Sequence, residues 1–166
     1  MASTTASTHL PPLGGHERDE IGRQLQATLV ELIDLSLVGK QLHWSVVGPD
    51  FRSLHLELDE FVETWRELAD TVAERAVAVG SFPDGQADAV AASADRGSVA
   101  RGQILDHDAV AELIRRVADA SERTRGRADR LAELDLASQD VLIDVLRALE
   151  RQQWMLRAQL GHGKRA

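Results

Sequence analysis

The sequence predicts an all-α protein of one domain, folded as a four-helix bundle with one long crossover. Residues that favour helices, namely Ala, Leu, Glu, Arg and Gln, dominate the composition. Apolar residues recur at helical spacing over long segments. Val, Ile and Thr never gather into alternating runs bounded by turn residues, so the strand signal is weak. The 166 residues, 43% of them hydrophobic, are enough for one domain with a buried core.

The first two helices are expected on either side of a break at residues 48–50. Residues 1–15 contain paired Pro, paired Gly and no charge, which predicts a flexible tail. A helix is expected from His16 to about Val46, where these apolar residues recur at helical spacing: Ile21, Leu25, Leu29, Leu32, Leu35 and Val38. Gly48-Pro49-Asp50 ends it, and Asp50 is the expected N-cap of a second helix. This helix is expected from about Phe51 to Val79.

The second half of the chain predicts two more long helices after a long connection. The connection runs from Gly80 to about Asp106 and contains an Ala-rich helical patch near residues 87–92. A single long crossover between the second and third helices is the ferritin-like topology, whereas a plain up-down bundle has short loops throughout. The third helix is expected over Asp108–Leu134 and the fourth from about Ser138 to Leu160. The predicted organisation is a flexible N-terminal tail (1–15), a ferritin-like bundle with a short helix in its crossover (16–160) and a short flexible C-terminal tail (161–166).

Composition and charge exclude several classes of function. The chain has no cysteine, which excludes disulfides, thiolate catalysis and zinc–thiolate sites. No segment reads as a signal peptide, and no apolar stretch reaches the ~18 residues needed to span a bilayer, so we expect a cytoplasmic protein. The formal net charge of −8 disfavours simple attraction to nucleic-acid phosphate and favours attraction of metal cations.

The second helix carries a stripe of candidate metal ligands. His55 and Asp59 are four residues apart, as are Asp70 and Glu74, so each pair shares a helix face. At about 100° per residue, all four fall within a stripe about 100° wide. The apolar residues of the helix centre about 150° away from this stripe, which therefore faces away from the subunit's own core. These apolar residues are Leu54, Leu58, Phe61, Trp65, Leu68 and Val72.

Spacing along the helix implies that one site needs two chains. His55 and Glu74 are separated by about 28 Å along the axis, too far to share an ion in one chain. Their midpoint lies between Thr64 and Trp65, and the midpoint of the inner two carboxylates coincides with it. Two copies that cross antiparallel on a two-fold axis there would place His55 against Glu74 of the partner subunit. We therefore expect two identical sites per dimer, and we expect a change at Trp65 to disrupt the crossing and abolish activity without touching a ligand.

His43, at the end of the first helix, would add a second imidazole to each site. A mixed set of carboxylates and imidazoles suits Fe(II), and two carboxylates could bridge a pair of ions. The alternative is a structural helical oligomer whose dimer holds only a salt-bridge network, because histidines on helices are often structural. That alternative does not explain why both His43 and His55 are present.

The ligand stripe lies inside a longer pattern that resembles the Dps family, the mini-ferritins of bacteria and archaea. The segment Leu149–Arg157 also resembles the last helix of that family, and the resemblance covers residues 16–160. The most specific part comprises His43-Trp44-Ser45-Val46-Val47-Gly48-Pro49-Asp50-Phe51-Arg52-Ser53-Leu54-His55, then Asp59, Asp70 and Ala73-Glu74-Arg75.

The resemblance implies a hollow shell of twelve identical subunits with a ferroxidase centre at each dimer interface. His43 and His55 of one chain would bind non-haem iron, two ions per site, with carboxylates of the other chain. Those carboxylates would be Asp70 and Glu74, and Asp59 would be a ligand or a supporting partner. The implied activity is oxidation of Fe(II) by hydrogen peroxide in preference to oxygen. The implied role is storage of the ferric mineral and protection against oxidative stress.

Further residues receive predicted roles beside the ligands. Trp44 is predicted to pack near the iron site and intercept stray oxidising equivalents, with packing in the core as the alternative. Asp135 and Asp140 flank the start of the last helix, where the resemblance implies an acidic pore for iron entry. An extra metal site at His9 and His16 is left open. Three glutamates are predicted to face the cavity and nucleate mineral, with a solvated acidic face as the alternative: Glu60, Glu63 and Glu67.

DNA binding is where the sequence departs from the best-known part of the family, in which a lysine-rich tail often carries that activity. Residues 1–17 contain no Lys or Arg, and the C-terminal tail offers only His162, Lys164 and Arg165. We expect DNA binding to be weak and salt-sensitive, or absent. The alternative function is that of a DNA-binding, nucleoid-compacting protein whose iron binding is secondary.

Overall fold

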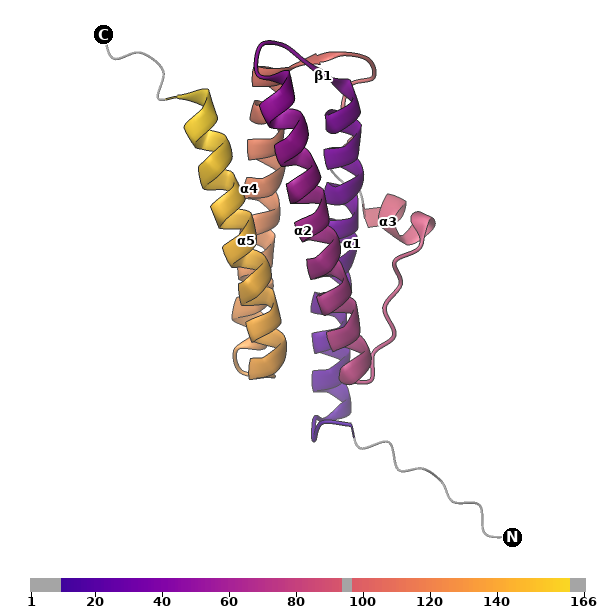
Figure 1. Cartoon of the computed structure of the whole chain (residues 1–166). Helices are drawn as coiled ribbons and strands as arrows, with labels where there is room; N and C mark the ends of the chain where they lie inside the picture. The colour runs from indigo at the N-terminus through magenta and orange to yellow at the C-terminus, as the bar shows by residue number, and fades with distance from the viewer. Residues whose placement is uncertain (1–9, 94–96, 162–166) are drawn as a thin grey trace.

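Four long helices form the bundle in the computed structural model, which describes residues 10–93 and 97–161 (Figure 1). The chain folds into two helical hairpins, in which α1 packs along α2 and α4 packs along α5. The long helices are α1 (Gly15–Ser45), α2 (Phe51–Ala78), α4 (Asp106–Leu131) and α5 (Leu136–Leu160). The short helix α3 (Ala87–Ser93) lies in the crossover between α2 and α4. The predicted all-α bundle with one long crossover and a short helix inside it is therefore confirmed.

The helix boundaries follow local chemistry. The Glu17 carboxylate accepts a hydrogen bond from the Gly14 backbone N–H at 2.8 Å, so α1 begins at Gly15. Arg18 donates to the Leu13 carbonyl at 3.2 Å, so residues 10–14 of the predicted tail contact the bundle. The rest of that tail (1–9) and most of the C-terminal tail (162–166) lie outside the described residues.

A short pair of parallel strands was not predicted. β1 (Val46–Val47) pairs with β2 (Ile104–Leu105), with Val46 opposite Ile104. Two residues are too few for an alternating pattern to be detectable in a sequence. The pairing ties the turn between α1 and α2 to the end of the crossover.

The core fills the space between the hairpins, and the predicted apolar stripe of α2 faces it. Leu54, Leu58 and Val72 are buried, and Leu68 is partly buried. Charged residues also join the hairpins, because buried Glu31 of α1 pairs with Arg123 of α4 at 2.7 Å. Within the described residues, no helix combines the length and apolarity needed to cross a membrane.

Trp65 lies in the core, as the predicted apolar stripe of α2 requires. Its side chain is 0% exposed, and its indole N–H donates to Oε1 of Gln152 on α5 at 2.8 Å. Trp65 therefore packs in the subunit's own core and cannot itself form the surface on which two copies cross. The expected effect of a change at Trp65 on that crossing stays a prediction, and such a change would have to act through the fold of the subunit.

Candidate metal centre

Two imidazole rings lie face to face where α1 ends and α2 begins. The ring centroids of His43 and His55 are 3.6 Å apart, with 21° between the ring planes. Nδ1 of His43 lies 2.9 Å from the carbonyl oxygen of His55, and Nδ1 of His55 lies 3.0 Å from that of His43. A carbonyl oxygen can only accept, so each Nδ1 carries a hydrogen, and in the neutral form of each ring Nε2 keeps its lone pair. The pair thus offers two nitrogens in the form that binds metal.

The turn at residues 46–50 brings the two histidines together. Gly48 adopts φ 135°, and a Cβ added there would lie 2.3 Å from Oδ2 of Asp106. Only glycine fits, because of both its backbone conformation and the space the carboxylate occupies. Asp106 accepts hydrogen bonds from the backbone N–H groups of Asp50 and His107, each at 2.8 Å. The bond from Asp50 does most to hold the pKa of Asp106 below its ordinary value.

Asp59 adds a carboxylate one turn further along α2. Its Oδ1 lies 3.4 Å from Nδ1 of His43 and 2.7 Å from Nζ of Lys40. The hydrogen bond from Lys40 is the main reason why the pKa of Asp59 lies below its ordinary value. His43, His55 and Asp59 form a group that could hold a metal ion, with one candidate ligand atom from each residue and all of them within 4.8 Å of one another. His43 is buried and Asp59 is exposed, so the group opens towards the surface.

Asp70 and Glu74 do not join this group within one chain. Both are exposed on α2, and helix geometry places them about 22 Å and 28 Å along the axis from His55. The subunit therefore brings together three of the five predicted ligands. A site shared with a second copy stays a prediction for the remaining two.

Comparison with known proteins identifies the family. A family model described as a ferritin-like domain matches residues 22–166. The DNA protection during starvation protein of Mycolicibacterium smegmatis is 37% identical over 153 residues, which cover 91% of this chain and 82% of that protein. The chain belongs to the Dps family. The resemblance seen in the sequence and the ferritin-like fold class are both confirmed.

Solved Dps structures share this fold. Dps from Mycobacterium smegmatis in a tetragonal form has a TM-score of 0.87 and 35% identity, covering 90% of this chain and 92% of that one. Dps from Microbacterium arborescens, described in its high iron form, has a TM-score of 0.86 and 29% identity, covering 92% of this chain and 99% of that one.

Trp44 of this Dps chain follows His43 in the sequence and lies outside the core. Its side chain is 71% exposed, so the alternative of packing in the subunit core is wrong. Nζ of Lys40 lies 5.9 Å from the centroid of the Trp44 ring, within reach of a cation–π interaction. Interception of oxidising equivalents by Trp44 stays a prediction.

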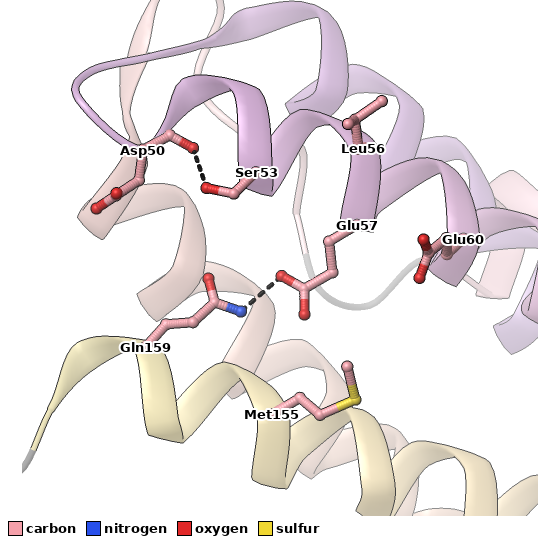
Figure 2. A pocket seen from close by; sticks show the side chains of 7 residues that line it. All are labelled: Asp50, Ser53, Leu56, Glu57, Glu60, Met155 and Gln159. Carbon is pink, nitrogen blue, oxygen red and sulfur yellow. Dashed lines mark hydrogen bonds between the residues drawn. The ribbon is translucent and has the colours of Figure 1, made fainter.

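An acidic pocket of about 470 Å³ lies between the start of α2 and the end of α5 (Figure 2). Glu57 reaches across it and accepts a hydrogen bond from Nε2 of Gln159 at 2.5 Å. Burial raises the pKa of Glu57 above its ordinary value, against that bond. Glu60 also lines the pocket, while Glu63 and Glu67 are exposed elsewhere on α2. Mineral nucleation by the three predicted glutamates stays a prediction.

Asp135 has a structural role in the subunit. Its carboxylate caps α5 by accepting from the Ser138 backbone N–H at 2.9 Å, and it pairs with Arg75 of α2 at 2.6 Å. Burial opposes ionisation of Asp135, but these hydrogen bonds outweigh it and lower its pKa. Asp140 is exposed one turn later. The predicted acidic pore stays a prediction for both residues.

Sequence reasoning missed Lys40 and Asp106. Lys40 had a local signal, since it lies three residues before His43 and therefore on the same side of α1. Asp106 had none, because its contact with residues 48–50 forms only when the crossover returns to the turn.

Proposed function

We propose that this Dps protein oxidises Fe(II) at sites shared between two subunits and stores the ferric product inside a hollow shell. The observation that supports it best is the His43–His55 pair, in which both Nε2 lone pairs are free for metal and Asp59 lies alongside. The solved structure of Dps from Microbacterium arborescens is described as a high iron form, and this chain covers 99% of its length. That similarity supports iron as the substrate.

The proposed ligands are of two chemical types, imidazole nitrogens and carboxylate oxygens. His43 and His55 would bind Fe(II) through Nε2, since imidazole suits that ion. Asp59, with Asp70 and Glu74 of the partner subunit, would supply oxygen ligands, whose negative charge stabilises the product Fe(III) more than the substrate. Each iron loses one electron, and hydrogen peroxide takes two electrons and two protons to become two waters. The reaction would consume both reagents from which hydroxyl radicals form.

Storage is proposed to depend on three further acids of α2. Twelve subunits would enclose a cavity, and Glu60, Glu63 and Glu67 would hold ferric ions on its wall while mineral grows. The formal net charge of −8 per chain would attract Fe(II) to the shell.

The ligands can be tested by paired substitution. His55→Ala with Asp70→Ala removes one imidazole and one carboxylate, and we expect the rate of ferric absorbance growth after Fe(II) and peroxide are mixed to fall about 100-fold. The matched control is His107→Ala with Asp108→Ala, an exposed pair on α4 whose side chains lie 3.3 Å apart. The control is expected to oxidise at the wild-type rate. An unchanged rate in the His55/Asp70 variant would overturn the proposed site.

A further inference from the structure

Met155 places a thioether in a groove between α2 and α5. The side chain packs, partly buried, against the core and lines two hollows, the acidic pocket of about 470 Å³ and a smaller one of about 80 Å³. Glu60 also lines both hollows, which together form the α2–α5 groove. In Figure 2 the Met155 side chain points from α5 towards the side of α2 that carries Glu57 and Glu60. Hydrogen peroxide is little larger than water, so a groove of this size admits it.

The chain offers few other side chains that are easily oxidised. It has no cysteine and no tyrosine, and its other methionine is Met1. Trp44 and Trp154 are exposed to solvent, whereas Trp65 is 0% exposed. Peroxide converts a thioether to the sulfoxide, a change that methionine sulfoxide reductases reverse. Met155 is therefore a side chain of the groove that can take up an oxidant reversibly.

The groove lies one layer of side chains away from Trp65. Phe61 and Gln152 line the smaller hollow together with Met155. The Phe61 ring centroid is 6.0 Å from that of Trp65, and Gln152 accepts the indole N–H at 2.8 Å. Oxidation of the buried indole would add a polar group to the core, which is costly without a hydrogen-bond partner. An oxidant in the groove therefore threatens the fold at Trp65.

We propose that Met155 is a modification site, oxidised to methionine sulfoxide by hydrogen peroxide that enters the α2–α5 groove, and that this reaction spares Trp65. The sulfur attacks one peroxide oxygen, so an S–O bond forms and the O–O bond breaks. The leaving hydroxide takes the remaining proton and becomes water. Sulfur loses two electrons and peroxide gains them. The inference rests on the proposed function, which brings iron and peroxide to the shell, and adds a role for a residue that binds no iron.

Peptide mass spectrometry of the assembled protein tests the modification. The protein is loaded with Fe(II), treated with a small excess of peroxide and cleaved after arginine, which releases residues 152–157 and 53–66 as separate peptides. Wild type is expected to gain one oxygen on Met155 before any oxygen appears on Trp65. Fragmentation of the first peptide separates Met155 from its neighbour Trp154. Oxidation of Trp65 ahead of Met155 would refute the proposal.

Two variants show whether the position of the thioether matters. Met155→Leu keeps an apolar side chain and removes the sulfur, and the oxidised fraction of Trp65 should rise about threefold. The matched control adds Leu160→Met to Met155→Leu, which restores the number of methionines. Leu160 lies on the same helix, 44% exposed, beside a hollow lined by Ile114 and Trp154 instead of the groove residues. The double variant should lose protection of Trp65 as Met155→Leu does.

The outcomes separate this inference from the proposed function. If the double variant protects Trp65 as well as wild type, or if Met155→Leu leaves Trp65 oxidation unchanged, the role of Met155 is refuted. Met155→Leu should still oxidise Fe(II) at the wild-type rate, since Met155 is not a ligand. If wild type produces no ferric absorbance, the proposed function fails, and peroxide alone still tests whether Met155 is oxidised before Trp65. Size-exclusion elution and helical circular dichroism confirm that each variant keeps its assembly and fold.

Discussion

The carbonyl groups of His43 and His55 determine which imidazole nitrogen can meet a metal. Each carbonyl accepts from the other residue's Nδ1–H, so tautomer and ring orientation are fixed before an ion arrives. Both rings belong to the ends of helices that the turn at 46–50 holds together. Little rotational freedom is left to lose on binding, which favours affinity. The orientation of the two imidazole rings is therefore set by backbone carbonyl groups, which every sequence has.

Trp65 gives a prediction at the same scale. Trp65→Ala should lower the free energy of unfolding by about 3–5 kcal/mol, because a buried indole is replaced by a cavity. Trp65→Phe keeps most of the volume but leaves Oε1 of Gln152 without its donor, and should cost about 1–3 kcal/mol. Urea unfolding at one protomer concentration measures both. Wild-type stability in Trp65→Ala, combined with dissociation of the oligomer, would show that Trp65 acts at the interface between copies and not in the core.

At the scale of elements, the contacts that fix the bundle's ends come from distant parts of the chain. The turn between α1 and α2 is held by Asp106 at the start of α4 and by the β1–β2 pair. The start of α5 is held to α2 by Arg75, which donates to Asp135 and Ser138. Each of these contacts joins the two hairpins at a place where apolar packing is interrupted by a turn. The candidate metal centre lies next to the first of them.

The α5 cap predicts a pH dependence. Asp135→Asn can still cap the helix but loses the charge that pairs with Arg75, so wild type should be more stable by about 1–2 kcal/mol at neutral pH. The pKa of Asp135 is lowered on folding, so its contribution is complete above the ordinary value of 3.8 and is lost as pH falls through the lower folded value. The free energies of unfolding of the two proteins, measured with urea from pH 7 downwards, should therefore converge below about pH 3.8.

The matched control for this dependence is Asp140→Asn, which changes an exposed carboxylate on the same helix. The difference between its free energy of unfolding and that of wild type should stay the same as the pH is lowered. A difference between wild type and Asp135→Asn that persists undiminished in strong acid would show that the ion pair with Arg75 is not its source.

At the scale of the whole molecule, one subunit holds the histidines and Asp59 together but leaves Asp70 and Glu74 far along α2. A complete centre is proposed to need two subunits, each giving three of its candidate ligands to one site and two to the other. Activity should then depend on pairing, and two inactive chains should be able to repair each other.

Mixed shells test this dependence. Chains with His55→Ala and chains with Glu74→Ala are each expected to be nearly inactive alone. In a mixed dimer one site carries both defects and the other carries neither, so random co-assembly should restore about one quarter of the sites. Fe(II) oxidation rate per subunit measures the recovery, with the two separately purified shells mixed without reassembly as the control. Failure to recover activity after reassembly would place the whole site within one chain.

The sequence by itself determined the helices, the crossover and the family, because helical periodicity and short motifs are local properties of the chain. It also separated the stripe of candidate ligands on α2 from the apolar stripe, and the burial of Trp65 confirms the apolar stripe. The antiparallel crossing of two copies stays a prediction, because helical spacing gives the midpoint of the candidate ligands along the axis but not how two subunits pack.

Tertiary structure alone decided the inner arrangement of the centre. The stacking of His43 on His55, the contact of Lys40 with Asp59 and the packing of Asp106 against Gly48 all join residues at least 12 positions apart. Such contacts depend on how α1, α2 and the crossover pack against one another. That packing is set by the shape of the core and not by the spacing of residues in the sequence. The sequence predicted the candidate ligands, and the tertiary structure placed the ammonium group of Lys40 against one of them, Asp59.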